Sequence, residues 1–122
     1  MGITTSKATP EEMEQIRKHV LDLIEKNAVI VFSKTYCPFC KQTKSSLASL
    51  NAKFKTVELD EIEDGSKIQD FLEEYTKQRS VPNIFINKKH IGGNSDLQKK
   101  IKEGTIQKML KEIPAQSATS AL

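Results

Sequence analysis

Apolar residues recur along the chain at spacings that predict alternating helices and strands. In the first segment they lie one to four residues apart, on one helical face: Met13, Ile16, Val20, Leu23 and Ile24. This spacing predicts a helix ending near Lys26. Thr9-Pro10-Glu11-Glu12 supplies its start, with a capping box and a proline at the first helical position. The next segment, Ala28–Ser33, is a continuous apolar run, typical of a strand buried on both faces.

The same criteria predict the rest of the chain. Six further elements are expected in this order: a helix at 38–50, a strand at 53–59, a helix at 65–77, a strand at 83–87, a strand at 89–91 and a helical region from 94 to about 113. Gly104 should interrupt the last region, and Asn94 or Ser95 should cap it.

This order of elements predicts an α/β fold. A helix separates the first two strands, so they should pair in parallel through a right-handed crossover, whereas the last two strands should form a hairpin. The result is a mixed four-stranded sheet flanked by helices on both faces. We find no internal repeat and no linker, which predicts one domain at residues 9–113 with flexible tails at 1–8 and 114–122.

Composition restricts the class of protein further. The chain has 122 residues, of which 37% are hydrophobic and 29% charged, enough for one core. No apolar run approaches the ~20 residues of a membrane span, and two cysteines cannot form the disulfide framework of a small secreted protein. We therefore expect a cytoplasmic protein. The pattern Met1–Ser6 also fits N-myristoylation of Gly2.

The charge distribution is more informative than the net charge of +3, which argues against a nucleic-acid partner. No Asp or Glu occurs from Asn27 to Val57, and both cysteines lie in this segment. It contains five lysines: Lys34, Lys41, Lys44, Lys53 and Lys55. The last three read equally well as a solvated surface, but Lys34 and Lys41 lie within four residues of a cysteine.

Cys37 and Cys40 are separated by two residues, between a predicted strand and a predicted helix. A zinc site would need more ligands, and His19 and His90 are distant in sequence, so we expect no metal. The strand-to-helix position instead favours a redox-active pair. Cys37 should attack and Cys40, one turn into the helix, should resolve.

The helix start explains why Cys37 would be the nucleophile. The thiolate is the reactive form, and cysteines in such motifs have thiol pKa values of ~3.5–7.5 instead of ~8.5. A helix dipole alone supplies only ~0.3–1 kcal/mol when exposed, which is less than one pKa unit. The N–H groups of Phe39 and Cys40, together with Lys34, are therefore expected to add to the dipole.

Three motifs now carry a family resemblance. Lys34-Thr35-Tyr36-Cys37-Pro38-Phe39-Cys40 resembles the active site of dithiol glutaredoxins, and Ser80-Val81-Pro82 and Gly92-Gly93-Asn94-Ser95-Asp96 continue the match in the same order. The resemblance extends from about Glu11 to Ile113. Thioredoxin itself matches poorly, since its active site has Trp before the first Cys and this chain has no Trp. Phe39, Ser80 and Asn94 depart from residues that are common in the family.

The resemblance implies a thioredoxin fold and a glutathione site. It assigns glutathione binding to Lys34, Tyr36, Phe39, Gln69, Val81, Pro82, Gly93, Ser95 and Asp96. Val81-Pro82 would be a cis-proline turn whose backbone pairs with glutathione, and Ser95 and Asp96 would hold its γ-glutamyl end. Lys34 and Gln69 would hold the glycyl carboxylate, with Arg79 a weaker candidate. Without the resemblance, Gln69 reads as a surface residue and Ser95 and Asp96 as helix caps.

The function implied is glutathione-dependent reduction of protein–glutathione mixed disulfides and of protein disulfides. Glutathione is then a co-substrate, glutathionylated or disulfide-containing proteins are partners, glutathione reductase acts indirectly, and the protein is a monomer. The alternative is a dimer that binds an iron–sulfur cluster through glutathione. Cys40 argues against the monothiol relatives that build clusters, and Pro38 is expected to disfavour a cluster.

Overall fold

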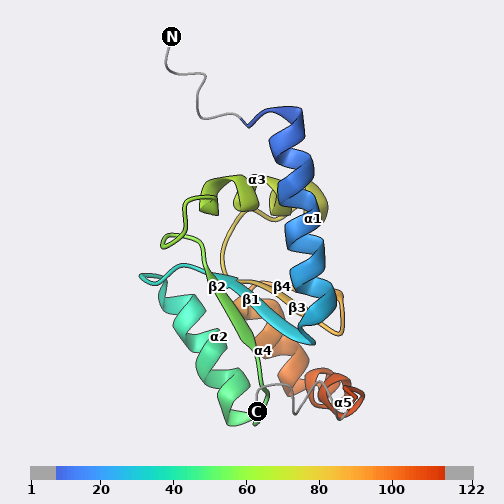
Figure 1. Cartoon of the computed structure of the whole chain (residues 1–122). Coiled ribbons are helices and arrows are strands. Elements are labelled where there is room, and N and C mark those ends of the chain that lie inside the picture. The colour runs from blue at the N-terminus through green and yellow to red at the C-terminus, as the bar shows by residue number, and fades with distance from the viewer. Residues whose placement is uncertain (1–7, 115–122) are drawn as a thin grey trace.

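The helices and strands follow the predicted order in the computed structural model, which describes residues 8–114 (Figure 1). They are α1 (Pro10–Lys26), β1 (Val29–Ser33), α2 (Pro38–Ser49), β2 (Lys55–Glu58), α3 (Gly65–Thr76), β3 (Asn83–Ile86), β4 (Lys89–Gly92), α4 (Asn94–Lys102) and α5 (Thr105–Lys111). The expectation about Gly2 and, apart from residues 8 and 114, the flexible tails expected at 1–8 and 114–122 lie outside the described part. Within that part, no helix is long and apolar enough to span a membrane.

The local sequence predicted the N-cap of α1 correctly but not the N-cap of α4. The predicted capping box of α1 is confirmed: Glu12 N–H donates to Thr9 Oγ1 at 3.1 Å, and Thr9 N–H donates to Glu12 Oε1 at 2.9 Å. The prediction for α4 was wrong, because Gly93 rather than Asn94 or Ser95 is the cap. The buried side chain of Asn94 bonds to α2 instead.

The sheet has the strand order β2-β1-β3-β4. β1 pairs in parallel with β2, with Ile30 opposite Lys55, and β3 pairs antiparallel with both β1 and β4. The mixed sheet and the hairpin are thus as predicted. Strand β2 is shorter than the predicted 53–59, because Phe54 precedes the ladder and packs against the core.

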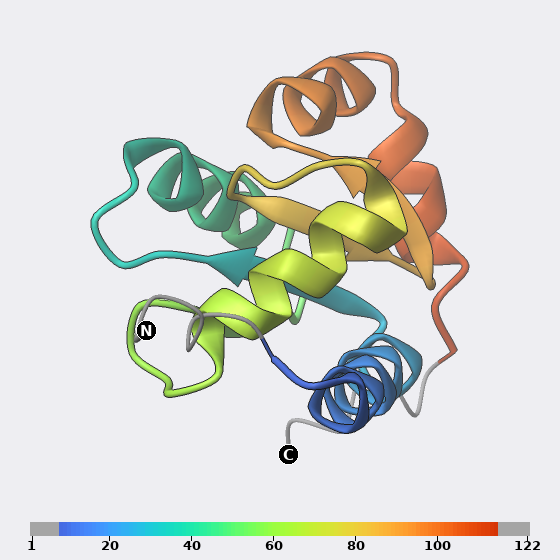
Figure 2. The same cartoon turned by 90° about the horizontal axis from the view of Figure 1, so that it is seen from above.

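Helices cover both faces of the sheet, as Figure 2 shows. Ile30 and Phe32 of β1 face the cluster beneath α1 and α3, which includes Val20, Ile68 and Leu72. On the opposite face, the cluster beneath α2, α4 and α5 contains Val29, Val31, Leu47, Leu97 and Ile106. Every residue of β1 is buried, so a continuous apolar run fits a strand covered on both sides.

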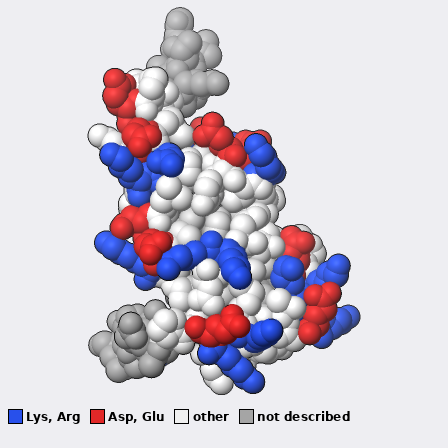
Figure 3. Space-filling model, turned by 90° about the vertical axis from the view of Figure 1, so that its right-hand side faces the viewer, with Lys and Arg blue, Asp and Glu red and all other residues white. Residues whose placement is uncertain are grey.

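The surface has no single-sign stripe on the face seen in Figure 3. Basic and acidic side chains alternate there around a broad uncharged area. Ion pairs among the described residues include Lys88 with Glu25 at 3.3 Å and Lys26 with Asp22 at 3.2 Å.

Candidate active site

Cys37 is the N-cap of α2, directly after the short loop that leaves β1. Its own N–H donates to the Lys34 carbonyl at 3.1 Å, and its carbonyl accepts from Lys41 N–H at 3.2 Å. Its Sγ accepts the N–H of Cys40 at 3.3 Å. Of the two N–H groups predicted to reach this sulfur, that of Phe39 makes no such bond within the described residues. The helix start therefore provides one donor to the sulfur in addition to the dipole.

The two cysteines are both free thiols in unequal surroundings. Cys37 is half-buried, whereas Cys40 is completely buried. Burial raises the pKa of the Cys40 thiol, and hydrogen bonds from the Lys34 backbone and the Ser33 hydroxyl only partly oppose this. The neighbouring Cys37 thiol raises it further. Cys37 is therefore the more accessible thiol, and burial favours the protonated form of Cys40 behind it.

The segment just before β3 lies beside the sulfur of Cys37. Cys37 Sγ is 3.8 Å from the carbonyl oxygen of Val81. The Val81-Pro82 peptide bond is cis, as the resemblance implied. Val81 is half-buried and Pro82 is buried. The Ser80-Val81-Pro82 motif therefore lies against the motif that contains Cys37.

The third motif lies beside Pro82. A Cβ on Gly93 would sit 3.7 Å from the Pro82 carbonyl oxygen, so the backbone at the start of α4 runs close to the turn. Gln78 Nε2 donates to the same oxygen at 3.0 Å. Asp96 is exposed, and its Oδ2 accepts the Gly93 N–H at 2.9 Å. Asp96 therefore hydrogen-bonds to Gly93, the N-cap residue of α4, and both Asp96 and Ser95 remain exposed.

The residues assigned to the glycyl carboxylate lie in a different setting. Gln69 is on α3, and its Nε2 donates to the Arg79 carbonyl at 2.8 Å. The Arg79 guanidinium is held by Asp70 at 2.7 Å and by Glu73 at 3.0 Å, and these carboxylates raise its pKa. Arg79 is therefore engaged elsewhere. Within the described residues no hydrogen bond joins Gln69 to Cys37.

Two aromatic side chains flank Cys37 and are open to solvent. Tyr36 is 68% exposed and Phe39 is 62% exposed. Large aromatic side chains are mostly buried in folded proteins, so the exposure of both rings is unusual. Two exposed aromatic rings therefore lie close to Cys37 in the chain.

Sequence reasoning missed a contact that anchors the active-site loop. Asp60, just after β2, accepts the N–H of Thr35 at 3.0 Å and also its hydroxyl. These bonds, from the hydroxyl first, lower the pKa of the Asp60 carboxyl, and Lys34 lowers it slightly more. No local signal marks the pair, since 25 residues separate the two positions.

A second missed contact joins α2 to the start of α4. The buried Thr43 hydroxyl donates to Asn94 Oδ1 at 2.9 Å, and Gln98 donates to the same oxygen at 3.1 Å. Asn94 Nδ2 donates to Gln42 at 2.8 Å. This network fixes the helix that bears the cysteines relative to the turn at Gly93.

Three of the five lysines in the acid-free segment, Lys44, Lys53 and Lys55, have settings of their own. Lys44 pairs with Glu58 at 2.5 Å, and Lys53 and Lys55 line a cavity near the start of β1. Lys53 and Lys55 are therefore distant from Cys37, because the length of β1 separates the cavity from Cys37. Among residues 8–114, no group of three His, Cys, Asp or Glu side chains could hold a metal.

Comparison with known proteins agrees with this geometry. The glutaredoxin family model matches residues 29–91. Glutaredoxin-2 of Schizosaccharomyces pombe is 52% identical over 90 residues, which cover 74% of this chain and 82% of the relative. A glutaredoxin of Ricinus communis is 51% identical over 94 residues, which cover 77% and 92%. The crystal structure of a buckwheat glutaredoxin–glutathione complex superposes with a TM-score of 0.84 at 40% identity, covering 86% of this chain and 96% of that one. The predicted thioredoxin fold is thereby confirmed.

Proposed function

The chain belongs to the glutaredoxin family, and we propose that it is a glutathione-dependent thiol–disulfide oxidoreductase that uses Cys37 as nucleophile and Cys40 as resolving thiol. One observation carries the assignment of roles. Cys37 Sγ, at the start of α2, accepts the Cys40 N–H at 3.3 Å, while the Cys40 side chain is completely buried. Only Cys37 can meet an incoming disulfide, and only Cys40 is close enough to act on Cys37 afterwards.

The first reaction uses Cys37 alone. Its thiolate attacks the glutathione sulfur of a protein–glutathione mixed disulfide, and the protein leaves as a thiolate that takes up a proton. A second glutathione thiolate then attacks the glutathione sulfur held on Cys37. Oxidised glutathione forms, and the Cys37 thiolate is restored.

The second reaction uses both cysteines. The Cys37 thiolate attacks a protein disulfide, which leaves one substrate thiolate and one mixed disulfide. Cys40, once deprotonated, attacks the sulfur of Cys37 and releases the second substrate thiol. Two glutathione molecules then reduce the Cys37–Cys40 disulfide. Glutaredoxin potentials of roughly −200 to −230 mV suit the cytosolic glutathione pool, and we propose the cytoplasm as its location.

The same proposal assigns the contacts to glutathione. The backbone of Val81 would pair with the tripeptide as an added strand, since its carbonyl oxygen lies 3.8 Å from Cys37 Sγ. The N–H groups at the start of α4, near Ser95 and Asp96, suit the γ-glutamyl carboxylate. Lys34 and Gln69 remain the candidates for the glycyl carboxylate. The buckwheat relative crystallised with glutathione supports this ligand.

A coupled assay tests the proposal. Glutathione reductase and NADPH report the oxidised glutathione formed when a small glutathione mixed disulfide is reduced. We expect turnover by the wild type, none by Cys37→Ser, and retained turnover by Cys40→Ser, which should lose the reduction of protein disulfides. Full activity of Cys37→Ser would contradict the mechanism.

The iron–sulfur alternative is not favoured by these findings, and a separate measurement addresses it. The purified protein is reconstituted anaerobically with iron, sulfide and glutathione, and its visible spectrum and mass in solution are recorded. We expect a monomer without cluster absorption. A cluster-bearing dimer that lacks turnover would replace the proposed function with cluster binding.

A further inference from the structure

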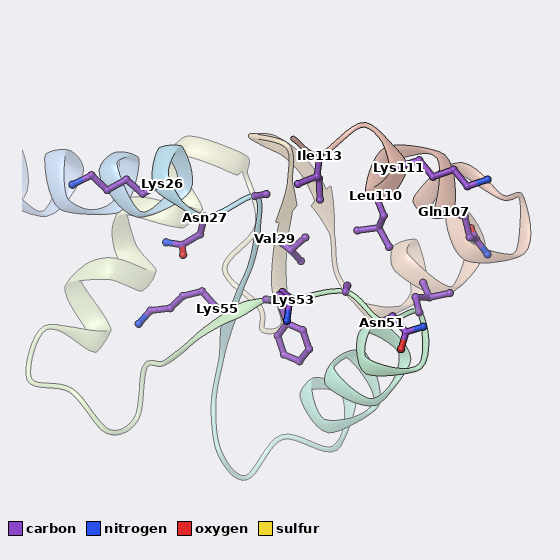
Figure 4. A pocket seen from close by; sticks show the side chains of 14 residues that line it. Lys26, Asn27, Val29, Asn51, Lys53, Lys55, Gln107, Leu110, Lys111 and Ile113 are labelled. Atoms are coloured by element: carbon purple, nitrogen blue, oxygen red, sulfur yellow. The ribbon is translucent and has the colours of Figure 1, made fainter. Parts of the chain in front are cut away.

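A cavity of about 590 Å³ lies at the end of the sheet where β1 begins. Its walls come from the end of α1, the start of β1, the segment between α2 and β2, and α5 (Figure 4). Val29, the first residue of β1, lines the cavity, whereas the last residue, Ser33, leads to Cys37. A five-residue strand is about 13 Å long. The cavity is therefore distinct from the site at Cys37.

The floor of the cavity is apolar. Val29 is buried, and Phe54, Leu110 and Ile113 are partly buried against the same core cluster. Figure 4 shows Leu110 and Ile113 directed toward the region beside Val29. Small-molecule pockets of roughly 300–1,000 Å³ have mostly apolar walls of this kind, so size and lining both suit a small ligand.

The rim of the cavity is uniformly basic. Four lysines line it, Lys26, Lys53, Lys55 and Lys111, and none of the 14 lining residues is acidic. In Figure 4 the side chains of Lys26 and Lys55 extend outward to one side of Val29 and that of Lys111 extends outward to the other, so their charges lie at the outer edge of the cavity.

Within residues 8–114, most of this charge has no acidic partner. Lys26 pairs with the exposed Asp22. Among residues 8–114, no carboxylate lies within 4.0 Å of the ammonium groups of the other three rim lysines. By comparison, two lysines that do not line the cavity have acidic partners: Lys44 pairs with Glu58, and Lys88 pairs with Glu25.

We propose that this cavity binds a small amphipathic carboxylate, whose apolar body lies on the floor formed by Val29, Phe54, Leu110 and Ile113 and whose anionic head meets the lysine rim. The apolar floor supplies binding through burial, and the rim selects the sign of the head group. Gln107 also lines the cavity, and its Oε1 is a buried acceptor with no partner among the described residues. Because an acceptor does not attract an anion, the lysines alone carry the preference for a carboxylate.

Decanoate is the probe for the test, added to the full-length reduced protein and followed by amide NMR shifts. We expect saturable shifts near Val29, Ala52 and Leu110, and none at Cys37. Decyltrimethylammonium, which has a similar apolar body and the opposite charge, should bind at least tenfold more weakly. Acetate, an anion without the body, should not shift these amides.

Variant proteins test the rim directly. Lys53→Gln with Lys55→Gln should weaken decanoate binding at least threefold, since each exposed charge interaction is modest. The matched control, Lys99→Gln with Lys102→Gln, removes the same charge from exposed positions on α4 and should bind as the wild type does. Both double variants should keep glutathione turnover, because the cavity takes no part in thiol exchange.

The proposal fails if decanoate causes no saturable shift in the full chain, if the cationic analogue binds equally well, or if the two double variants weaken binding equally. It also fails if the cavity amides shift with protein concentration alone, which would make a second copy of the chain the occupant. None of these outcomes depends on the thiol mechanism. Loss of turnover in Cys37→Ser and binding of decanoate are therefore separate results.

Discussion

The sulfur of Cys37 lies 3.8 Å from the carbonyl oxygen of Val81, although 44 positions separate the two residues in the chain. The contact joins the loop that follows β1 to the segment that precedes β3. Under the proposed function, a disulfide that approaches Cys37 would meet the backbone of Val81 at the same time, and this backbone would pair with a peptide-like ligand.

Alkylation should distinguish the two thiols. Iodoacetamide reacts with the thiolate, and burial both covers Cys40 and raises its pKa. Near neutral pH we expect Cys37 to be modified first, with Cys40 following only at higher pH or on unfolding. Peptide mapping by mass spectrometry measures the order, and the urea-unfolded chain, in which both should react, is the control. Earlier modification of Cys40 would reverse the assigned roles.

The network at Asn94 should contribute to stability. Asn94→Ala leaves the buried Thr43 hydroxyl without its acceptor, which should lower the free energy of unfolding by about 1–3 kcal/mol. Thr43→Val serves as the partner variant in a double-mutant cycle followed by urea denaturation. We expect the two effects to be non-additive by at least about 0.5 kcal/mol. Strict additivity would show that the bond contributes no coupling.

Gly65 should tolerate no side chain. A Cβ there would lie 1.8 Å from the Leu59 carbonyl oxygen, a backbone atom that cannot rotate away. Gly65→Ala should therefore lower the free energy of unfolding by about 3 kcal/mol, the upper range for overpacking.

Gly104 provides the matched control for this substitution. Its φ is +82°, and no atom lies within 4 Å of an added Cβ. Gly104→Ala should therefore cost only about 1 kcal/mol for the left-handed backbone. Equal losses in thermal or urea unfolding would contradict the steric explanation.

His90 should make stability depend on pH. Its ring packs at 5.1 Å from the Phe85 ring, and its Nε2 lies 2.8 Å from Asn83 Oδ1, although the residue as a whole remains accessible. Burial lowers the pKa of His90, and Asp96 opposes this only in part. The folded state thus favours the neutral ring. Its contribution is present above the unfolded pKa of about 6.5 and is lost as the pH falls through the folded value.

Urea midpoints measured from neutral to mildly acidic pH test this dependence. The wild type should lose stability below about pH 6.5 more steeply than His90→Gln. His19, which is exposed on α1, offers the control, and His19→Gln should follow the wild-type curve. Identical slopes for the wild type and His90→Gln would exclude His90 as the source.

Local features made much of the fold predictable. The capping box at Thr9 and the buried run of β1 depend on neighbouring residues, and both were confirmed. The start of α4 was predicted wrongly because the Asn94 side chain is satisfied by α2, which lies far away in sequence. A residue suited to a cap locally was thus used for packing.

The sequence by itself determined that Cys37 would stand at a helix start with Cys40 one turn behind it, since the spacing and Pro38 fix that geometry locally. Only the tertiary structure decided which groups surround them. Val81 meets Cys37, and Asp60 holds Thr35, because the pairing of β1 with β3 and β2 aligns distant segments. The same pairing sends Lys53 and Lys55 toward the opposite end of the sheet. Charge near a site depends on this three-dimensional pairing, which nearness in sequence does not reveal.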